Sequence, residues 1–390
     1  MPFTAPSGIQ GIFQKLGGSF GLFEKGGSVL GVDIGSSSIK VVQLSKKYGK
    51  VVLETYGELA LGPYGATEVG RSVSIPVEKI GEALNDVIRE ASITTRNAGI
   101  AIPLASSLVT IIDMPAVPEG KLAEMVPFEA RKYIPIPINE VTLDWRIIPQ
   151  GGDNWVERGF EELPTDGSAK KGEMSPKSKV LLVAIHNEVL SRYEKIAKLA
   201  NLTASFIEIE IFSAIRSILS KERAPVLVVD IGAGTTKLSL IENGVVLNSH
   251  IINRGSQDIT LMLARSHGIT VIKAEELKRE VGISADPQHK STKDIAELIV
   301  TGIFTEANKV LLDYEKEYRK TITKVFLSGG GSLIKGIMDI AKKNFDGEVV
   351  FATPFDKVEA PAFLIPTLHE IGPLFAVSLG VALRKLQEMG

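Results

Sequence analysis

Residues 31–40 read Gly31-Val32-Asp33-Ile34-Gly35-Ser36-Ser37-Ser38-Ile39-Lys40, and residues 229–237 read Val229-Asp230-Ile231-Gly232-Ala233-Gly234-Thr235-Thr236-Lys237. In both stretches, an apolar strand carries an Asp near its end. A Gly and small or hydroxyl residues follow in a tight turn, and a Lys starts the next strand. Glycine lets the backbone approach a ligand closely, turn N–H and hydroxyl groups can point at oxygens, and the Asp can hold hydrated Mg²⁺. The two halves therefore predict a split polyphosphate clamp, with candidate contacts at Asp33, Gly35, Ser36, Ser37, Ser38, Lys40, Asp230, Gly232, Gly234, Thr235 and Thr236.

A third glycine-rich turn, Ser328-Gly329-Gly330-Gly331-Ser332, follows the apolar strand expected at Lys324–Leu327. A flat nucleobase could lie on this turn, because glycine leaves the backbone open to close approach. One Asp-x-Gly turn is ordinary turn chemistry, but two copies with equal spacing and a third glycine-rich turn together indicate a nucleotide site. The sequence contains neither a G-x-x-x-x-G-K-[ST] loop nor a G-x-G-x-x-G turn between a strand and a helix.

The composition of the 390 residues narrows the class of protein. Hydrophobic residues make up 44% of the chain, enough for the cores of two to three domains at roughly 150 residues each. The formal net charge of −2 provides no basic field, so nucleic acid is not expected as a partner. The chain has no cysteine and its five His residues show no metal-ligand spacing. No uninterrupted apolar run approaches the roughly 18 to 20 residues of a membrane-spanning helix, so a cytoplasmic protein is expected.

Hydrophobic periodicity divides the chain into two related halves with an insertion in the first. Residues 28–103 and 187–222 are expected to form a first lobe, and residues 223–390 a second. Within the second lobe, 268–320 would be a helical subdomain on the nucleotide side, and the final helix would pack back towards the first lobe. Residues 104–186 read as a separate inserted unit. Two segments poor in packing residues are expected to be flexible: 1–27, which is rich in glycine, and the polar loop 151–177.

Three local predictions concern helices and strands. Pro127 suits the first position of a helix and Pro135 ends one, so a short helix is expected over Phe128–Tyr133, serving either packing or a partner. A buried connecting helix is expected over Ile207–Leu219. Ser256 is a candidate N-cap for a helix beginning at Gln257.

These motifs resemble the superfamily of actin, the DnaK-type chaperones, the sugar kinases, MreB and FtsA. Residues 33–40 resemble its first phosphate hairpin, 230–237 its second, and 328–332 its adenosine motif, while residues 254–260 resemble a turn near the phosphates that includes Gly255. The fold that the resemblance implies is α/β, an actin-like (ribonuclease H-like) two-lobed fold with a small inserted subdomain in the first lobe. The E-x-x-K-R pattern of Glu275, Lys278 and Arg279 resembles residues that sandwich adenosine, although such a pattern is also typical of a solvated helix face.

Within that superfamily the chain resembles most the PilM family, actin-like proteins of type IV pilus assembly. The resemblance rests on the triple-Ser turn Ser36–Ser38, the run from Pro127 to Pro137 followed by Asp144-Trp145, and the run from Val183 to His186. It implies a cytoplasmic protein held at the inner membrane by its partners. The partner implied is the N-terminal cytoplasmic peptide of a PilN-like membrane protein, alongside other inner-membrane and motor components of the pilus machinery, and self-association is possible.

The resemblance also implies a mechanism. Mg·ATP (or ADP) would occupy the cleft, with Asp33 and Asp230 holding Mg²⁺ through water and Lys40 neutralising phosphate charge. Gly329, Gly330, Gly331 and Ser332 would face the adenosine. Hydrolysis needs a group that orients water, for which Glu210 is the first candidate and Glu208 the second, and both are equally readable as surface carboxylates. ATP binding with at most slow hydrolysis is therefore expected.

Two other functions are consistent with the superfamily. An FtsA-like or MreB-like filament protein of the cytoskeleton or of cell division is the first. FtsA-like proteins usually end in an amphipathic membrane helix after a linker, whereas residues 375–389 here read as continuous with the fold. A sugar kinase is the second, but no Asp stands in a recognisable sugar pocket.

Overall fold

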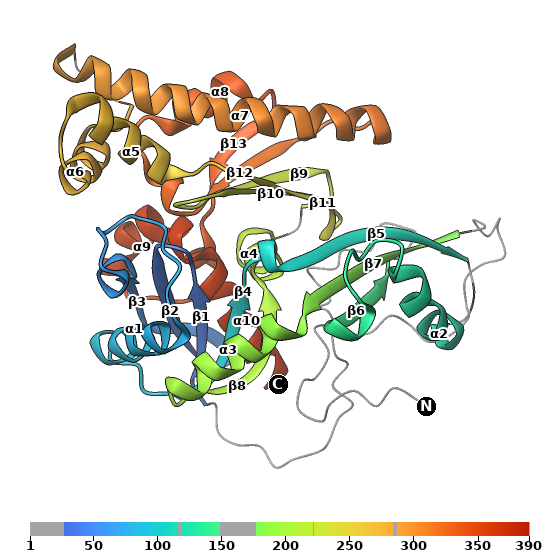
Figure 1. Ribbon diagram of the computed structural model, residues 1–390. Coiled ribbons are helices and arrows are strands. Elements are labelled where there is room, and N and C mark those ends of the chain that lie inside the picture. Colours follow the sequence, from blue (N-terminus) through green and yellow to red (C-terminus); the bar gives the residue numbers. More distant parts are fainter. Residues whose placement is uncertain are drawn as a thin grey trace.

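The computed structural model describes residues 27–115, 117, 119–148, 177–220, 222–283 and 287–389. The flexibility expected for residues 1–27 and 151–177 falls almost wholly outside these ranges. Three sheets organise the described chain (Figure 1).

The first sheet begins with the predicted three-strand meander. Its strand order is β3-β2-β1-β4-β8, with β1, β2 and β3 antiparallel and β4 and β8 added in parallel. All six residues of β1 are buried, as expected for a central strand flanked on both faces. Asp33 on β1 pairs with Lys40 on β2. The strands are β1 (Val29–Ile34), β2 (Ser38–Lys47), β3 (Lys50–Ala60), β4 (Asn97–Ile102) and β8 (Thr203–Ile209).

The second sheet repeats this plan. Its strand order, β11-β10-β9-β12-β13, again joins three antiparallel strands to two parallel ones. Asp230 on β9 pairs with Lys237 on β10, the same register as Asp33 with Lys40. The duplication predicted from the two motifs is therefore present in the sheets. The strands are β9 (Val226–Ile231), β10 (Thr236–Glu242), β11 (Val245–Ile252), β12 (Lys324–Ser328) and β13 (Glu348–Phe351).

A separate antiparallel sheet, in the order β5-β7-β6, extends from the first lobe (Figure 1). We call it the inserted sheet: β5 (Ser107–Pro115), β6 (Val141–Ile147) and β7 (Lys177–His186), covered by α2 (Glu119–Ala130). Its β5 also lies beside β11 of the second sheet. At this junction Lys179 Nζ lies 5.3 Å from the centroid of the Tyr318 ring.

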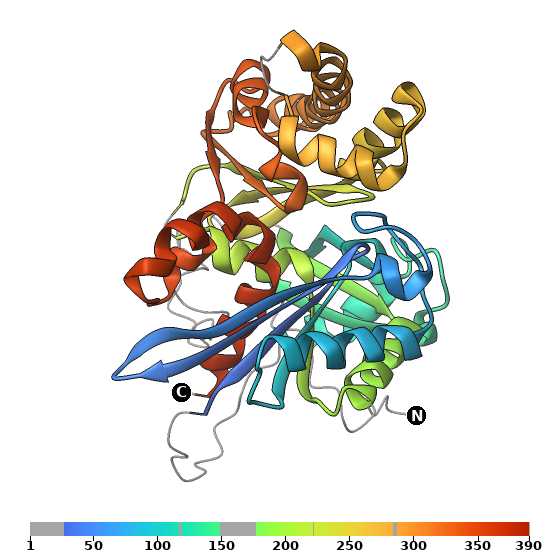
Figure 2. The same ribbon diagram turned by 90° about the vertical axis from the view of Figure 1, so that its left-hand side faces the viewer.

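The helices pack in layers on the two larger sheets (Figures 1 and 2). On the first sheet, α1 and α3 pack together, while α10 contacts β1, β2 and β4 and packs against α4. On the second, α5, α7 and α8 share one core with the strands. The helices not yet bounded are α1 (Val77–Glu90), α3 (Asn187–Leu199), α4 (Glu210–Ile218), α5 (Ser256–His267), α6 (Val271–Val281), α7 (Lys290–Tyr318), α8 (Ile337–Asn344), α9 (Ile365–Ile371) and α10 (Ala376–Glu388).

The last helix, α10, is a core helix of the fold. Two glycines allow the backbone of α10 to contact the backbones of β1 and α4 directly. A Cβ added at Gly31 would lie 1.9 Å from Ser378 O, and one added at Gly380 would lie 1.8 Å from Ser213 O. The run of helices over Ala362–Glu388 is long and apolar enough to qualify as a membrane span by length and composition. Its α10 part instead packs against the first sheet.

Three predictions of local structure were wrong. Helix α2 runs over Glu119–Ala130 with Pro127 inside it. The N–H groups of Tyr133 and Ile134 both donate to Ala130 O, so the chain forms a turn here instead of continuing as a helix to Tyr133. Residues 203–209 form strand β8, because they pair with β4, and the connecting helix begins only at Glu210. Gly255, not Ser256, is the N-cap of α5, and its N–H donates to Asp258 Oδ2 at 2.7 Å.

Candidate functional site

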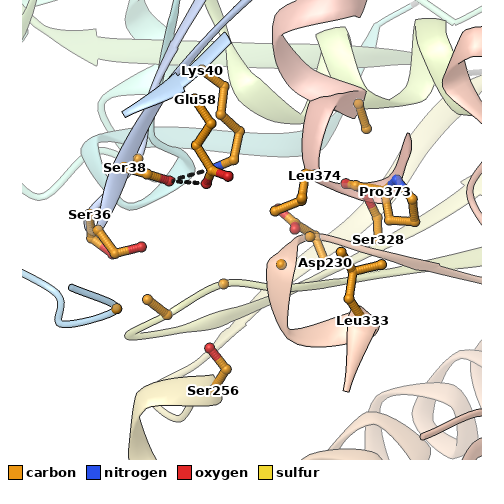
Figure 3. Close-up of a pocket in the computed structure, with 18 of the residues that line it drawn as sticks. Ser36, Ser38, Lys40, Glu58, Asp230, Ser256, Ser328, Leu333, Pro373 and Leu374 are labelled. Atoms are coloured by element: carbon orange, nitrogen blue, oxygen red, sulfur yellow. Dashed lines mark hydrogen bonds and ion pairs between the residues drawn. The ribbon is translucent and has the colours of Figure 1, made fainter. Parts of the chain in front are cut away.

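A cavity of about 480 Å³ lies between the two larger sheets. It is lined by both hairpin turns, by the turn after β12, by α6 and by the segment before α10. In Figure 3, Ser36, Ser38, Lys40 and Glu58 lie on one side of the cavity and Asp230, Ser328 and Leu333 on another. The volume is within the usual range for a small-molecule or cofactor site.

The two hairpin turns have the same backbone geometry. Gly35 N–H donates to Ser38 O at 3.0 Å in the first, and Gly232 N–H donates to Thr235 O at 2.9 Å in the second. A Cβ on Gly232 would lie 2.8 Å from Thr235 O, so this position requires glycine for steric reasons. The N–H and hydroxyl groups of both turns border one cavity, which is the arrangement that a polyphosphate requires.

Asp33 is the unsatisfied acid of the first hairpin. Its side chain is 9% exposed, lines the cavity, and forms no hydrogen bond or ion pair with any residue that the structure describes. Burial raises the pKa of Asp33 to about 6, with Lys40 opposing the rise. Although Lys40 is paired with Asp33 in the sheet, its ammonium donates to Ser38 Oγ at 2.8 Å and lies 3.7 Å from Glu58 Oε1. A buried carboxylate without a partner favours a cation beside it.

The second hairpin carries a different network. Lys237 Nζ lies 2.8 Å from Glu210 Oε2 and 3.4 Å from Asp230 Oδ2. Burial by itself would lower the pKa of Lys237, but Glu210 and Asp230 raise it above its usual range. The other oxygen of Glu210 accepts a hydrogen bond from Leu104 N–H at 2.7 Å. Asp230 and Glu210 are thus already partly neutralised by the protein's own lysine.

The far side of the cavity carries a buried ion pair. Lys278 Nζ lies 2.7 Å from Glu275 Oε2, and Thr260 and Arg279 also donate to the Glu275 carboxylate. Burial opposes ionisation of Glu275, but Lys278, Thr260 and Arg279 together outweigh it and lower the pKa of the carboxyl. Glu275, Lys278 and Arg279 all line the cavity, so the helix face predicted from E-x-x-K-R is directed at the site and is not simply solvated.

Contacts across the cavity join the first lobe to α5 and α6. Ser72 N–H donates to Gln257 Oε1 at 2.9 Å. Gly70, with φ +87°, lies so close to Glu275 that an added Cβ would be 2.8 Å from the Glu275 Cδ atom. The loop between β3 and α1 therefore closes over the side of the cavity formed by α5 and α6.

Of the nineteen binding residues predicted from sequence, fourteen line this cavity and five do not. Those that line it are Asp33, Gly35, Ser36, Ser37, Ser38, Lys40, Asp230, Gly232, Thr235, Glu275, Lys278, Arg279, Gly329 and Gly330. The candidate catalytic residue Glu210 lines it as well. Those that do not are Gly234, Thr236, Gly255, Gly331 and Ser332.

Four of the five residues outside the lining support the turns from behind, and the fifth, Gly234, lies against Ser72 and Gln257. Thr236 is fully buried and its hydroxyl donates to Arg254 O at 2.9 Å. Ser332 Oγ donates to Gly329 O at 2.7 Å, which places it inside the turn. A Cβ on Gly255 would lie 2.4 Å from Ala233 O, so this glycine allows α5 to approach the second hairpin. Gly331 lies against Ile231 in the same way.

Glu208 is excluded as a residue of this cavity. It is buried and lies 2.7 Å from Arg216 Nη2 and 2.9 Å from Arg384 Nη1. Burial works against its ionisation, yet the two arginines lower the pKa of Glu208 to about 2. The carboxylate therefore joins β8, α4 and α10 as a structural ion cluster.

Several lining residues were not identified from sequence as ligand contacts. Glu58 comes from β3, Gly70 from the loop after it, and Lys335 from the segment before α8. Lys237 was recognised only as the last residue of its motif. Pro373 O accepts hydrogen bonds from Gly329 N–H and Ser328 Oγ, which brings residues 373–377 to the site. Of these residues, only Lys237 could have been found from sequence, because it follows Asp230 at the same spacing at which Lys40 follows Asp33.

The residues present fit a nucleotide with a divalent cation on the Asp33 side. No cluster of three or more His, Cys, Asp or Glu suited to a metal occurs in the described ranges, so a cation here would need phosphate and water oxygens besides protein carboxylates. Mg²⁺ is usually bound in this way. Asp33 is the carboxylate available for it, while Asp230 is shared with Lys237.

Two similar lobes that bring paired hairpins to one cavity define an actin-like fold. The fold is shared with a solved PilM-PilN type IV pilus biogenesis complex, at a TM-score of 0.74, 22% identity and coverage of 92% of this chain and 98% of that chain. It is also shared with the ethanolamine utilization protein EutJ from Carboxydothermus hydrogenoformans, at a TM-score of 0.52, 16% identity and coverage of 93% and 90%. A curated relative is the cell division protein FtsA of Neisseria meningitidis serogroup B, 24% identical over 327 residues, which are 75% of this chain and 77% of the relative.

The family model described as type IV pilus assembly protein PilM matches residues 31–157 and 160–386. The chain belongs to this family.

Proposed function

We propose that the chain binds ATP or ADP between its lobes and serves type IV pilus assembly as a scaffold for the N-terminal cytoplasmic peptide of a PilN-like membrane protein. The observation that carries the nucleotide proposal is the cavity in which the unpartnered carboxylate of Asp33 lies beside two hairpin turns of equal geometry. The family and the resemblance to a PilM-PilN complex support the partner. Such a protein would lie in the cytoplasm, at the inner membrane through its partner.

The lining residues divide into three groups under this proposal. The turns at Ser36–Ser38 and Gly232–Thr235 donate N–H and hydroxyl hydrogens to phosphate oxygens. Lys40 neutralises phosphate charge, and Asp33 and Asp230 would hold Mg²⁺ through water, a cation that would screen the phosphates. The adenosine lies between the Glu275, Lys278 and Arg279 face of α6 and the turn at Gly329 and Gly330.

Binding is supported more strongly than hydrolysis. A hydrolytic site needs a group free to orient water in line with the terminal phosphate. Both oxygens of Glu210 are engaged, by Lys237 and by Leu104 N–H. We therefore infer at most slow turnover, with Glu210 as the residue through which it would occur.

The inserted sheet offers a surface for a peptide partner. Phe128, Tyr133 and Met125 are exposed on α2 and the turn that follows it, with exposed fractions of 67%, 42% and 36%. Aromatic and Met side chains are enriched at protein interfaces. We assign the peptide contact to the neighbourhood of this sheet.

Isothermal titration calorimetry with Mg·ATP tests the nucleotide site. We expect binding to the full chain and loss of at least tenfold in affinity for Asp33→Ala and for Asp230→Ala. The absence of adenine nucleotide uptake, or uptake that both substitutions leave unchanged, would contradict the proposal. Titration with a synthetic PilN-like N-terminal segment, with and without ATP, tests the partner. Failure of this peptide to bind, together with filaments that sediment when ATP is added, would support the FtsA-like alternative.

A further inference from the structure

We propose that Lys237 is a positioning residue that transmits nucleotide occupancy to the inserted sheet, through Glu210 and the amide of Leu104. The inference rests on the proposed nucleotide binding and adds the route by which binding reaches the partner surface. Three contacts define the route: Lys237 Nζ to Asp230 Oδ2 at 3.4 Å, Lys237 Nζ to Glu210 Oε2 at 2.8 Å, and Leu104 N–H to Glu210 Oε1 at 2.7 Å.

Each residue of this route belongs to a different structural unit. Lys237 lies on β10 of the second sheet, and Glu210 is the first residue of α4, which follows the first sheet. Leu104 begins the short 3₁₀ helix Leu104–Ser106 that leads directly into β5. One buried carboxylate therefore connects the second lobe to the entrance of the inserted sheet.

The inserted sheet can respond as a body to a change at Leu104. Strand β5 pairs with β7 along its whole length, from Ser107 with Ile185 to Pro115 with Lys177. The sheet and α2 share one apolar core. Since packed cores move as units and do not deform continuously, a shift at the entrance of β5 is carried to α2 and its exposed aromatic residues.

Phosphate in the cavity competes with Glu210 for the Lys237 ammonium. The cavity that holds the phosphates is lined by Lys237, Asp230 and Glu210 alike. When the ammonium turns to phosphate, the Glu210 carboxylate keeps its negative charge with the Leu104 N–H as its remaining bond, and a hydrogen bond to an uncompensated charge is the stronger one. We therefore expect nucleotide to tighten the Glu210–Leu104 hydrogen bond.

The equivalent lysine of the first hairpin has no such connection. Lys40 contacts Ser38 and Glu58, both within the first sheet and its turn. It lines the same cavity, so it is a matched control for the loss of a phosphate-side charge without loss of the route.

Hydrogen exchange of the full chain, read by mass spectrometry over residues 103–107, tests the inference, with calorimetry of Mg·ATP on the same samples. In the native chain we expect saturating Mg·ATP to slow exchange at this segment at least threefold. In Lys237→Met, at ATP concentrations that calorimetry shows to be saturating, we expect a change below 1.5-fold, because Glu210 has already lost its ammonium partner before nucleotide binds. In Lys40→Met, again at saturation, the slowing should remain.

The double variant Lys237→Met/Glu210→Gln removes both charges of the closer ion pair together and protects the test against misfolding of the single variant, because the buried Glu210 carboxylate is not left without its lysine. It should also lose the response. Nucleotide binding without any exchange change at residues 103–107, or an undiminished response in Lys237→Met, would overturn the inference and leave the proposed nucleotide site intact. No calorimetric binding in the native chain would overturn the proposed function itself.

Discussion

Lys40 pairs with Asp33 across β1 and β2, yet its ammonium contacts Ser38 Oγ at 2.8 Å and leaves the Asp33 carboxylate without a bond among the described residues. The protein therefore keeps one buried acid unsatisfied in the cavity. A buried acid without a hydrogen-bond partner is typical of sites that a ligand completes, and it has consequences for stability as well as for binding.

Asp33→Asn should stabilise the nucleotide-free protein at pH 7.5. Burial raises the pKa of Asp33 to about 6. A raised carboxyl pKa means that the folded state holds a proton more tightly than the unfolded chain, so stability is greatest below the unfolded pKa and falls as the pH rises towards 6. The variant avoids this loss, which we expect to be about 2 kcal/mol by urea denaturation.

The stability advantage of Asp33→Asn over the native protein should vanish at pH 4, where residue 33 is uncharged in the folded state of both proteins. The variant should also lose nucleotide binding. Equal stability of the two proteins at pH 7.5 would show that Asp33 has a cationic partner in the free protein.

Glu208→Gln should destabilise the fold, by about 3 kcal/mol, because it removes the buried carboxylate that neutralises Arg216 and that, together with Glu388, neutralises Arg384. The lowered pKa of Glu208, about 2, means that this stabilisation is present above the ordinary Glu pKa and is lost as the pH falls towards 2. Thermal and urea unfolding at pH 7 measure the difference.

The matched comparison for Glu208 is Glu210→Gln, two residues further along the chain. It should affect nucleotide turnover and exchange at Leu104 more than Glu208→Gln does. A Glu208→Gln protein of native stability would refute the structural role of this cluster.

Gly380→Ala should destabilise the protein by about 2 kcal/mol or more, since the added methyl group would overlap Ser213 O and push α10 away from α4. Chemical denaturation provides the measurement. Gly120→Ala is the control, because Gly120 lies in helix α2 with no atom within 4 Å of the added Cβ. The control should be neutral or stabilising, by up to about 1 kcal/mol. A Gly380→Ala protein as stable as the native chain would show that α10 and α4 accommodate the added methyl group without cost.

Gln257→Ala should speed nucleotide dissociation about fivefold, because it removes the hydrogen bond from Ser72 N–H that joins the two sides of the cavity. Stopped-flow displacement of a fluorescent ATP analogue measures the rate. Ser72→Ala is the control: it keeps the backbone N–H that makes the contact, so its dissociation rate should stay close to that of the native chain. Equal rates in the native chain and Gln257→Ala would show that this contact does not limit release.

Local sequence was sufficient for the repeated hairpins. Their Asp, Gly and Lys positions are set by strand and turn preferences within ten residues, and the structure pairs Asp33 with Lys40 and Asp230 with Lys237 in one register. The same local reasoning placed the turn at 328–332 after a strand, because three consecutive glycines interrupt any periodic pattern. It could not tell that Ser332 and Gly331 lie behind that turn, since their orientation depends on the contact with Ile231.

The sequence by itself determined the residue types of a nucleotide site, because turn chemistry and hydrophobic period are local properties, and the resemblance of its motifs to known families indicated the actin-like class. Only the tertiary structure separated Glu208 from Glu210. Two residues apart on a continuing strand, they would lie on the same face. Pairing with β4 makes 203–209 a strand, and the change to helix at Glu210 sends one carboxylate to Arg216 and Arg384 and the other to Lys237. Both sets of partners come from distant parts of the chain, and no local pattern reports where such segments meet.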